Sequence, residues 1–94
     1  MSTNEEMQVI GKVVTEYAEV KRRVTALEER ARGYGAEITR IGKALSNVRF
    51  GSLEIELAAM PTREAVEELL ADLHATRERR THLLASLREF GLEG

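Results

Sequence analysis

Apolar side chains recur along the first half of the chain with the period of a coiled-coil helix. Twelve successive positions, separated by alternating steps of three and four residues, are apolar or aromatic: Ile10, Val13, Tyr17, Val20, Val24, Leu27, Ala31, Tyr34, Ile38, Ile41, Leu45 and Val48. We name this run the seam, because it places one apolar stripe along a helix and offers it to partner helices. The pattern predicts a first helix over about residues 5–46.

Four glycines lie within this predicted helix, and each costs about 1 kcal/mol there relative to alanine. They are Gly11, Gly33, Gly35 and Gly42. The seam keeps its phase across Gly33 and Gly35, so we expect one continuous helix. The pair is either a weak point that a long helix tolerates, or a hinge or close approach of a partner backbone.

The hydrophobic period changes after the seam. Apolar residues now alternate with polar ones, at Val48, Phe50, Leu53, Ile55 and Leu57. Gly51 and Ser52 separate the two alternating runs and suit a two-residue hairpin turn. We predict that residues 46–61 are extended or form a short β-hairpin, and we name residues 47–61 the connector. The competing interpretation is a short helix over residues 53–60 with Ser52 as its N-cap.

A second helix is predicted over about residues 62–90. Pro61 disfavours helical geometry at the residue before it, and Thr62 is a good N-cap. At the other end, Gly91 suits a left-handed C′ residue, with Leu92 folding back as in a Schellman motif. The fold class is therefore predicted to be all-α. We expect a single domain, residues 1–94, built as a long antiparallel helical hairpin with coiled-coil packing.

The two predicted helices differ in length, which leaves part of the seam without a partner. If the chain turns near residue 55, Ala31 lies opposite about Arg80, and Leu45 opposite about Val66. The second helix then covers the seam over about residues 20–48 and ends opposite residue 20. The uncovered residues are predicted to form an oligomer or partner interface: Met7, Ile10, Val13, Val14 and Tyr17. A patch of this kind is unusual on a monomer, so we expect a homo-oligomer, either a dimer or a tetramer.

Composition narrows the classes of function. The chain has no cysteine, which excludes disulfides and thiol chemistry. No apolar stretch approaches the roughly 20 residues that span a bilayer, so we expect no membrane span. The first residues are acidic where a signal peptide is basic, and we expect a soluble cytoplasmic protein. The net charge of −2 disfavours nonspecific binding to nucleic acid.

Few residues are candidates for chemistry. His74 and His82 lie about 12 Å apart along a helix, too far to share one metal ion, so we interpret them as surface residues. Arg77, Arg79 and Arg80 form the densest basic cluster, which could contact phosphate, although interleaved acids favour a salt-bridged face. No catalytic or phosphate-binding motif is present. We expect no enzyme activity, no cofactor, no metal site and no small-molecule substrate.

The predicted order of elements is a helix, a connector of alternating apolar and polar residues, and a capped helix. This order resembles that of the prefoldin β-type subunit. The resemblance lies in the seam over residues 38–48, the segment 48–57 and the helix capped by Thr62, and it is one of topology over about half the chain. It implies that connector hairpins assemble into barrels, which places five residues in assembly: Val48, Phe50, Leu53, Ile55 and Leu57. It further implies that the helix ends hold unfolded protein, through Met7, Ile10, Leu87 and Phe90.

We therefore expect a non-enzymatic coiled-coil protein that acts as a scaffold, an adaptor or a regulatory subunit, with a protein partner. The first alternative is a prefoldin-like holdase chaperone subunit, which requires a connector hairpin. The second alternative is a nucleic-acid-associated protein that uses the basic cluster of the second helix.

Overall fold

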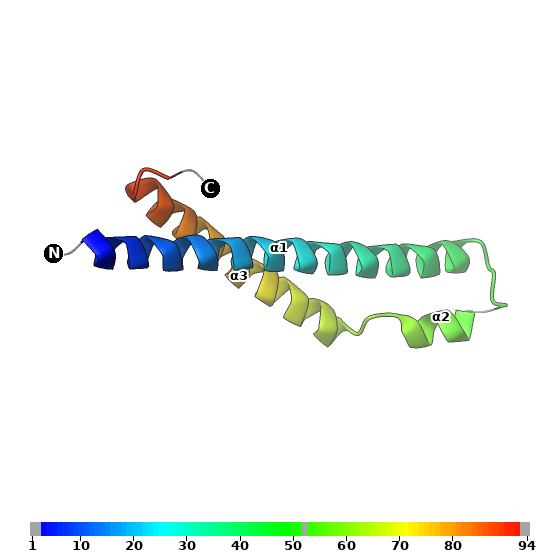
Figure 1. The fold of residues 1–94 in the computed structure, drawn as a ribbon. Helices are drawn as coiled ribbons and strands as arrows, with labels where there is room; N and C mark the ends of the chain where they lie inside the picture. The colour runs from blue at the N-terminus through cyan, green and yellow to red at the C-terminus, as the bar shows by residue number, and fades with distance from the viewer. Residues whose placement is uncertain (1–2, 52, 93–94) are drawn as a thin grey trace.

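Three helices follow one another in the computed structural model, which describes residues 3–51 and 53–92. They are α1 (Thr3–Ser46), α2 (Leu53–Ala59) and α3 (Arg63–Glu89). The described residues contain no strand, so the predicted all-α class is confirmed. The molecule is elongated, with extents of 69 × 19 × 15 Å along its principal axes, and α1 accounts for most of its length (Figure 1).

Helix α1 is continuous from Thr3 to Ser46, close to the predicted residues 5–46. Gly33 and Gly35 lie inside it without a break. A Cβ atom added to either glycine would meet no other atom within 4 Å, so nothing in the chain requires a missing side chain there. No close approach within the chain therefore explains the pair, and its role as a tolerated weak point or a hinge stays a prediction.

The seam packs against α3 in the middle of the molecule. Val24 and Leu27 of α1 are at most 2% exposed, and they form the core together with Leu69 and Leu73 of α3. Three half-buried seam residues surround this core: Val20, Ala31 and Tyr34. Burial of these apolar side chains is the main force that holds the two helices together.

Helix α3 begins and ends as its sequence predicts. The Thr62 hydroxyl accepts a hydrogen bond of 3.0 Å from the backbone N–H of Ala65, as an N-cap does. At the other end, Gly91 has a φ of +80°, and the N–H of Leu92 donates to the carbonyl of Leu87. These are the features of a Schellman motif, which is therefore confirmed.

Helix α1 ends in the same motif, although its sequence gives no such signal. Val48 takes the left-handed position with a φ of +54°, and its N–H donates to the carbonyl of Leu45. The N–H of Arg49 donates to the carbonyl of Ala44 at 2.8 Å. Val48 thus occupies the place that Gly91 occupies after α3, and it does so with a β-branched side chain.

The connector contains a helix, and the predicted β-hairpin is wrong. Helix α2 begins at Leu53 and ends at Ala59, which agrees with the competing interpretation of a short helix. Leucine, alanine and glutamate favour helix, and Ile55 is the only β-branched residue of this segment. A lone hairpin is marginally stable in water, whereas α2 packs on α1 and leaves Leu53 only 8% exposed. The predicted N-cap, Ser52, lies outside the described residues.

Helix α3 meets α1 closer to the N-terminus than predicted. Arg79 donates to the Glu16 carboxylate at 2.7 Å, whereas the prediction placed Arg80 opposite Ala31. The shift arises because α2 lies beside the end of α1, so that α3 begins further back along it (Figure 1). The end of α3 therefore reaches the first turns of α1, and the predicted N-terminal overhang is wrong.

The seam is also less covered at its C-terminal end than predicted. Ile41 is buried, but Ile38, Leu45 and Val48 are between 46% and 67% exposed. The expected coverage of residues 20–48 is therefore wrong for the last part of the seam. Figure 1 shows the reason: α3 crosses α1 at a marked angle and diverges from it on both sides.

Candidate functional site

Exposed apolar side chains gather at the two ends of the molecule. Five form what we name the terminal surface, near the start of α1 and the end of α3: Met7, Val9, Val14, Phe90 and Leu92. Seven form what we name the connector surface, at the end of α1 and around α2: Ile38, Leu45, Val48, Phe50, Ile55, Leu57 and Met60. Among the described residues, only Leu70 is a large exposed apolar residue elsewhere. Such surfaces mark interaction sites more often than catalytic ones.

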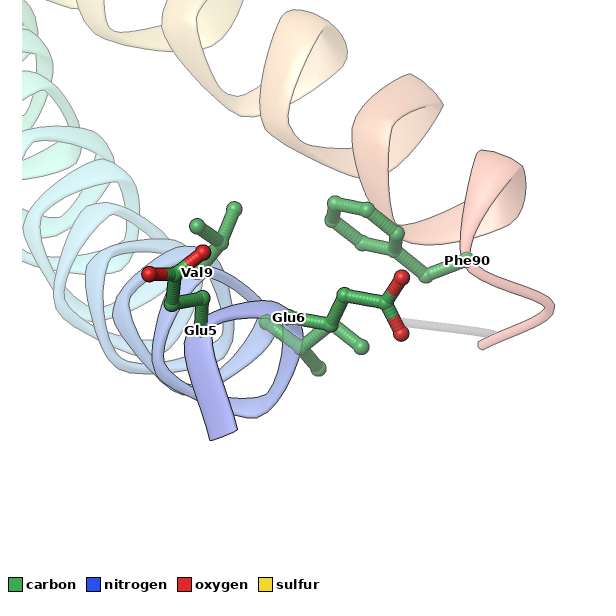
Figure 2. A pocket seen from close by; sticks show the side chains of 5 residues that line it. Glu5, Glu6, Val9 and Phe90 are labelled. Atoms are coloured by element: carbon green, nitrogen blue, oxygen red, sulfur yellow. The ribbon is translucent and has the colours of Figure 1, made fainter. Parts of the chain in front are cut away.

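The terminal surface contains a hollow of about 580 Å³ between α1 and the end of α3. Its lining combines acidic and apolar residues: Glu5, Glu6, Val9, Ile10 and Phe90. In Figure 2, the Phe90 ring points from the end of α3 toward the first turns of α1, and Glu6 extends on the same side. The hollow therefore offers an apolar floor with carboxylates at its edge.

A second hollow, of about 530 Å³, lies further along α1. Its lining combines basic and apolar residues: Val14, Tyr17, Ala18, Lys21, Arg22, Leu87 and Leu92. The Lys21 ammonium lies 5.6 Å from the centroid of the Tyr17 ring, within the range of a cation–π contact. The terminal surface is thus acidic at its start and basic about four helical turns later.

The residues predicted as an oligomer interface lie on or beside this terminal surface. Met7 is 64% exposed and Val14 is 44% exposed, so both are available to a partner. Ile10, Val13 and Tyr17 are half-buried, because the end of α3 lies closer to them than predicted. Their role in an interface stays a prediction. Phe90 and Leu92 were not assigned to this interface, since the predicted register placed the end of the second helix opposite residue 20 of α1, about ten residues away from Ile10.

Most residues predicted for connector assembly are exposed, although the segment is not a hairpin. Four of the five lie on the connector surface: Val48, Phe50, Ile55 and Leu57. The fifth, Leu53, is buried at 8% exposure and holds α2 on α1. Ile38 and Leu45 were missed, because the seam was expected to be covered there. Met60 was missed because it lies outside the alternating pattern that selected the other five residues.

Ion pairs flank the core on both sides. Arg23 donates to Asp72 at 2.5 Å, and Arg77 donates to Glu28 at 2.8 Å. Arg40 of α1 also lies 3.5 Å from the carboxylate of Glu56 in α2. The side chains of these pairs are between 23% and 59% exposed, and an ion pair that solvent reaches contributes only about 0–1 kcal/mol. The pairs therefore add little to the stability that the apolar core provides.

One carboxylate titrates differently because of such a pair. The hydrogen bond from Arg77 lowers the pKa of Glu28 below its ordinary value, and the charges of Arg77, Arg32 and Arg80 act in the same direction. The guanidinium groups favour the ionised carboxylate. Glu28 is therefore ionised near neutral pH.

The basic cluster predicted on the second helix faces the acids of α1. Arg77 pairs with Glu28, and Arg79 pairs with Glu16. Arg80 is half-buried beside them. Two of the three cations are therefore engaged within the chain, and this arrangement does not favour a phosphate-binding role.

The two histidines lie on the surface of α3. Both are exposed, and His74 Nε2 lies 3.3 Å from a carboxylate oxygen of Glu78, one turn along the same helix. Within the described ranges, no group of three or more His, Asp or Glu side chains is placed to hold a metal ion.

No helix among residues 3–51 and 53–92 is both long and apolar enough to cross a membrane. The terminal surface and the connector surface are the best candidates for a site, because both gather exposed apolar side chains. Comparison with protein-family models, with curated proteins and with solved structures finds no match for this chain.

Proposed function

We propose that this chain is a non-enzymatic assembly protein that forms homo-oligomers by coiled-coil packing of its apolar helix faces. It would serve as a scaffold, an adaptor or a regulatory subunit. The observation that carries this proposal is the uncovered end of the seam, where Ile38, Leu45 and Val48 are between 46% and 67% exposed. Helices use a stripe of this period to pack on one another, and here the chain itself does not cover it.

The exposed area of the chain supports the same proposal. Its accessible surface is 7213 Å², whereas a compact chain of this length exposes about 5,400 Å². The excess of about 1,800 Å² is larger than the roughly 800 Å² that each partner buries in a standard interface. The radius of gyration, 20.3 Å, likewise exceeds the value of about 12 Å for a compact domain. Association is the simplest way to remove such an excess from water.

Neither alternative function has an observation in its favour. The prefoldin-like holdase required a connector hairpin, and the connector forms helix α2 instead. The nucleic-acid-associated protein required free arginines on α3, and Arg77 and Arg79 pair with acids of α1. The assembly function is therefore the one that these contacts favour.

Light scattering coupled to size exclusion tests the proposal directly. Between about 1 and 100 µM chain, we expect a molar mass of two or four chains that decreases on dilution. A mass of one chain throughout this range would contradict the proposal, because the apolar surfaces would then face water permanently.

A further inference from the structure

Five side chains near the start of α1 form a ridge that winds past the end of α3 and has complementary ends. They follow one another at steps of four residues: Glu6, Ile10, Val14, Ala18 and Arg22. Ile10 and Ala18 are half-buried, and the other three are exposed. The ridge has an acid at its first end, a base at its last end and apolar groups between them. Val14 lies at its centre, and the whole ridge is about 24 Å long at 1.5 Å per residue.

The ridge is complementary to a second copy of itself. If a copy is turned end for end about Val14, its Arg22 faces Glu6 and its Ala18 faces Ile10. Val14 then faces Val14 across the axis. Rows of side chains at steps of four residues are the ridges through which helices most often pack, at about 50° to each other. A parallel copy would place Glu6 beside Glu6 and Arg22 beside Arg22, an arrangement that like-charge repulsion disfavours.

The surroundings of the ridge suit this arrangement. Glu6 and Arg22 form no ion pair with the rest of the described chain, so each can pair with a partner. Glu6 borders the hollow of about 580 Å³ beside Phe90, which has room for an incoming guanidinium (Figure 2). Arg22 and Lys21 border the second hollow, which would receive the partner's carboxylate.

We propose that two copies of this chain pair antiparallel through this ridge, with a twofold axis at Val14. The inference rests on the proposed assembly function and adds the partner, the orientation and the register. The interface is isologous, because each copy supplies the same ridge. The connector surface is left free at the outer ends of such a dimer.

The absence of cysteine from the chain allows a direct test by disulfide trapping. A Val14→Cys variant carries a single thiol, and its two copies would face each other across the axis. A disulfide requires Cα atoms within about 7 Å, so we expect mild oxidation to give a covalent dimer. A Thr39→Cys variant, with its thiol on a distant exposed turn of α1, is the matched control and should give little dimer.

Two further variants test the orientation. Ile10→Cys and Ala18→Cys should each form little disulfide alone, since like positions lie about 12 Å apart along the antiparallel pair. A mixture of the two should form the mixed dimer. Efficient dimer formation by either variant alone would overturn the antiparallel orientation.

A charge exchange tests the pairing without a covalent bond. Glu6→Arg and Arg22→Glu should each raise the dimer dissociation constant about tenfold at low salt. The double variant should restore it to within about twofold, because the opposite charges face each other again. Sedimentation gives the dissociation constants, and circular dichroism confirms that the variants are helical. Failure of the double variant to recover, with its helix content intact, would overturn the pairing of Glu6 with Arg22.

The outcomes separate this inference from the proposed function. A mass of one chain in light scattering would remove both. An oligomer in light scattering, together with no Val14→Cys disulfide, would leave the assembly function standing and remove the pairing at Val14. The contact would then lie on the connector surface or on another part of the terminal surface.

Discussion

At the scale of single residues, the two long helices end in the same way with different side chains. Gly91 adopts a φ of +80° after α3, and Val48 adopts a φ of +54° after α1. Glycine has no Cβ atom and takes this conformation without strain, whereas a β-branched residue rarely does. The sequence therefore predicts the motif at Gly91, and no local signal predicts it at Val48.

Replacement of Val48 should relieve this strain. We expect Val48→Gly to raise the free energy of unfolding by about 0.5–1 kcal/mol, since relief of the left-handed conformation exceeds the added entropy of the unfolded chain. The Val48 side chain is 67% exposed, so little packing is lost. Urea unfolding at low concentration measures the change. Gly91→Val is the matched opposite substitution and should lower the free energy of unfolding. Equal changes in the free energy of unfolding for the two variants would contradict the strain at Val48.

The Glu28–Arg77 pair makes a prediction about pH. Because the pKa of Glu28 is lower in the folded chain than its ordinary value of 4.5, the pair stabilises the fold above that pH. Its contribution is lost as the pH falls through the lowered pKa. In Arg77→Met, the carboxyl of Glu28 should titrate closer to 4.5 by NMR. Arg79→Met is the control and should leave the Glu28 titration in place, whereas an unchanged titration in Arg77→Met would argue against the pair.

At the scale of elements, the long helices could be predicted from local signals. The seam and the caps gave residues 5–46 and 62–90, and the structure has Thr3–Ser46 and Arg63–Glu89. Residues 53–59 could not be assigned in the same way, because alternation fits a strand while composition fits a helix. The choice between strand and helix depends on tertiary structure, namely on whether Leu53 can be buried against another helix. The predicted register of α3 along α1 relied on the hairpin, so it was wrong as well.

The candidate site was predictable to the same degree. Met7 and Val14 were found because they lie in the apolar N-terminal part of α1. Ile38 and Leu45 were missed, because their exposure depends on the angle at which α3 crosses α1 and on its register. The sequence pattern of a single helix does not determine that crossing angle.

Neighbouring leucines in α3 test the packing of the elements. Leu69 is 5% exposed and belongs to the core, whereas Leu70 is 56% exposed. Leu69→Ala should lower the free energy of unfolding by about 2–3 kcal/mol, since it leaves a cavity in a small core. Leu70→Ala should change it by less than about 0.5 kcal/mol. Urea unfolding at low protein concentration makes the comparison, and similar losses for both variants would disagree with the packing described.

At the scale of the whole molecule, the connector surface extends the proposal beyond a dimer. Leu45 is 51% exposed there, and Leu45→Glu should prevent helices from packing on this end of the seam. We expect its molar mass by light scattering to be half that of the parent chain wherever the parent forms tetramers. Thr39→Glu places the same charge on an exposed polar position of α1 and should keep the parent mass. An unchanged tetramer in Leu45→Glu would exclude this surface from the assembly.

The two apolar surfaces lie at opposite ends of a molecule 69 Å long, and this separation governs how an assembly stops growing. A copy that associates through one self-complementary end closes as a pair. Copies that associate through both ends form a closed tetramer where the assembly closes on itself, and otherwise a filament whose length increases with concentration. A different protein bound at the connector surface would prevent further copies from adding at that end. Its abundance would therefore set the number of chains in the assembly.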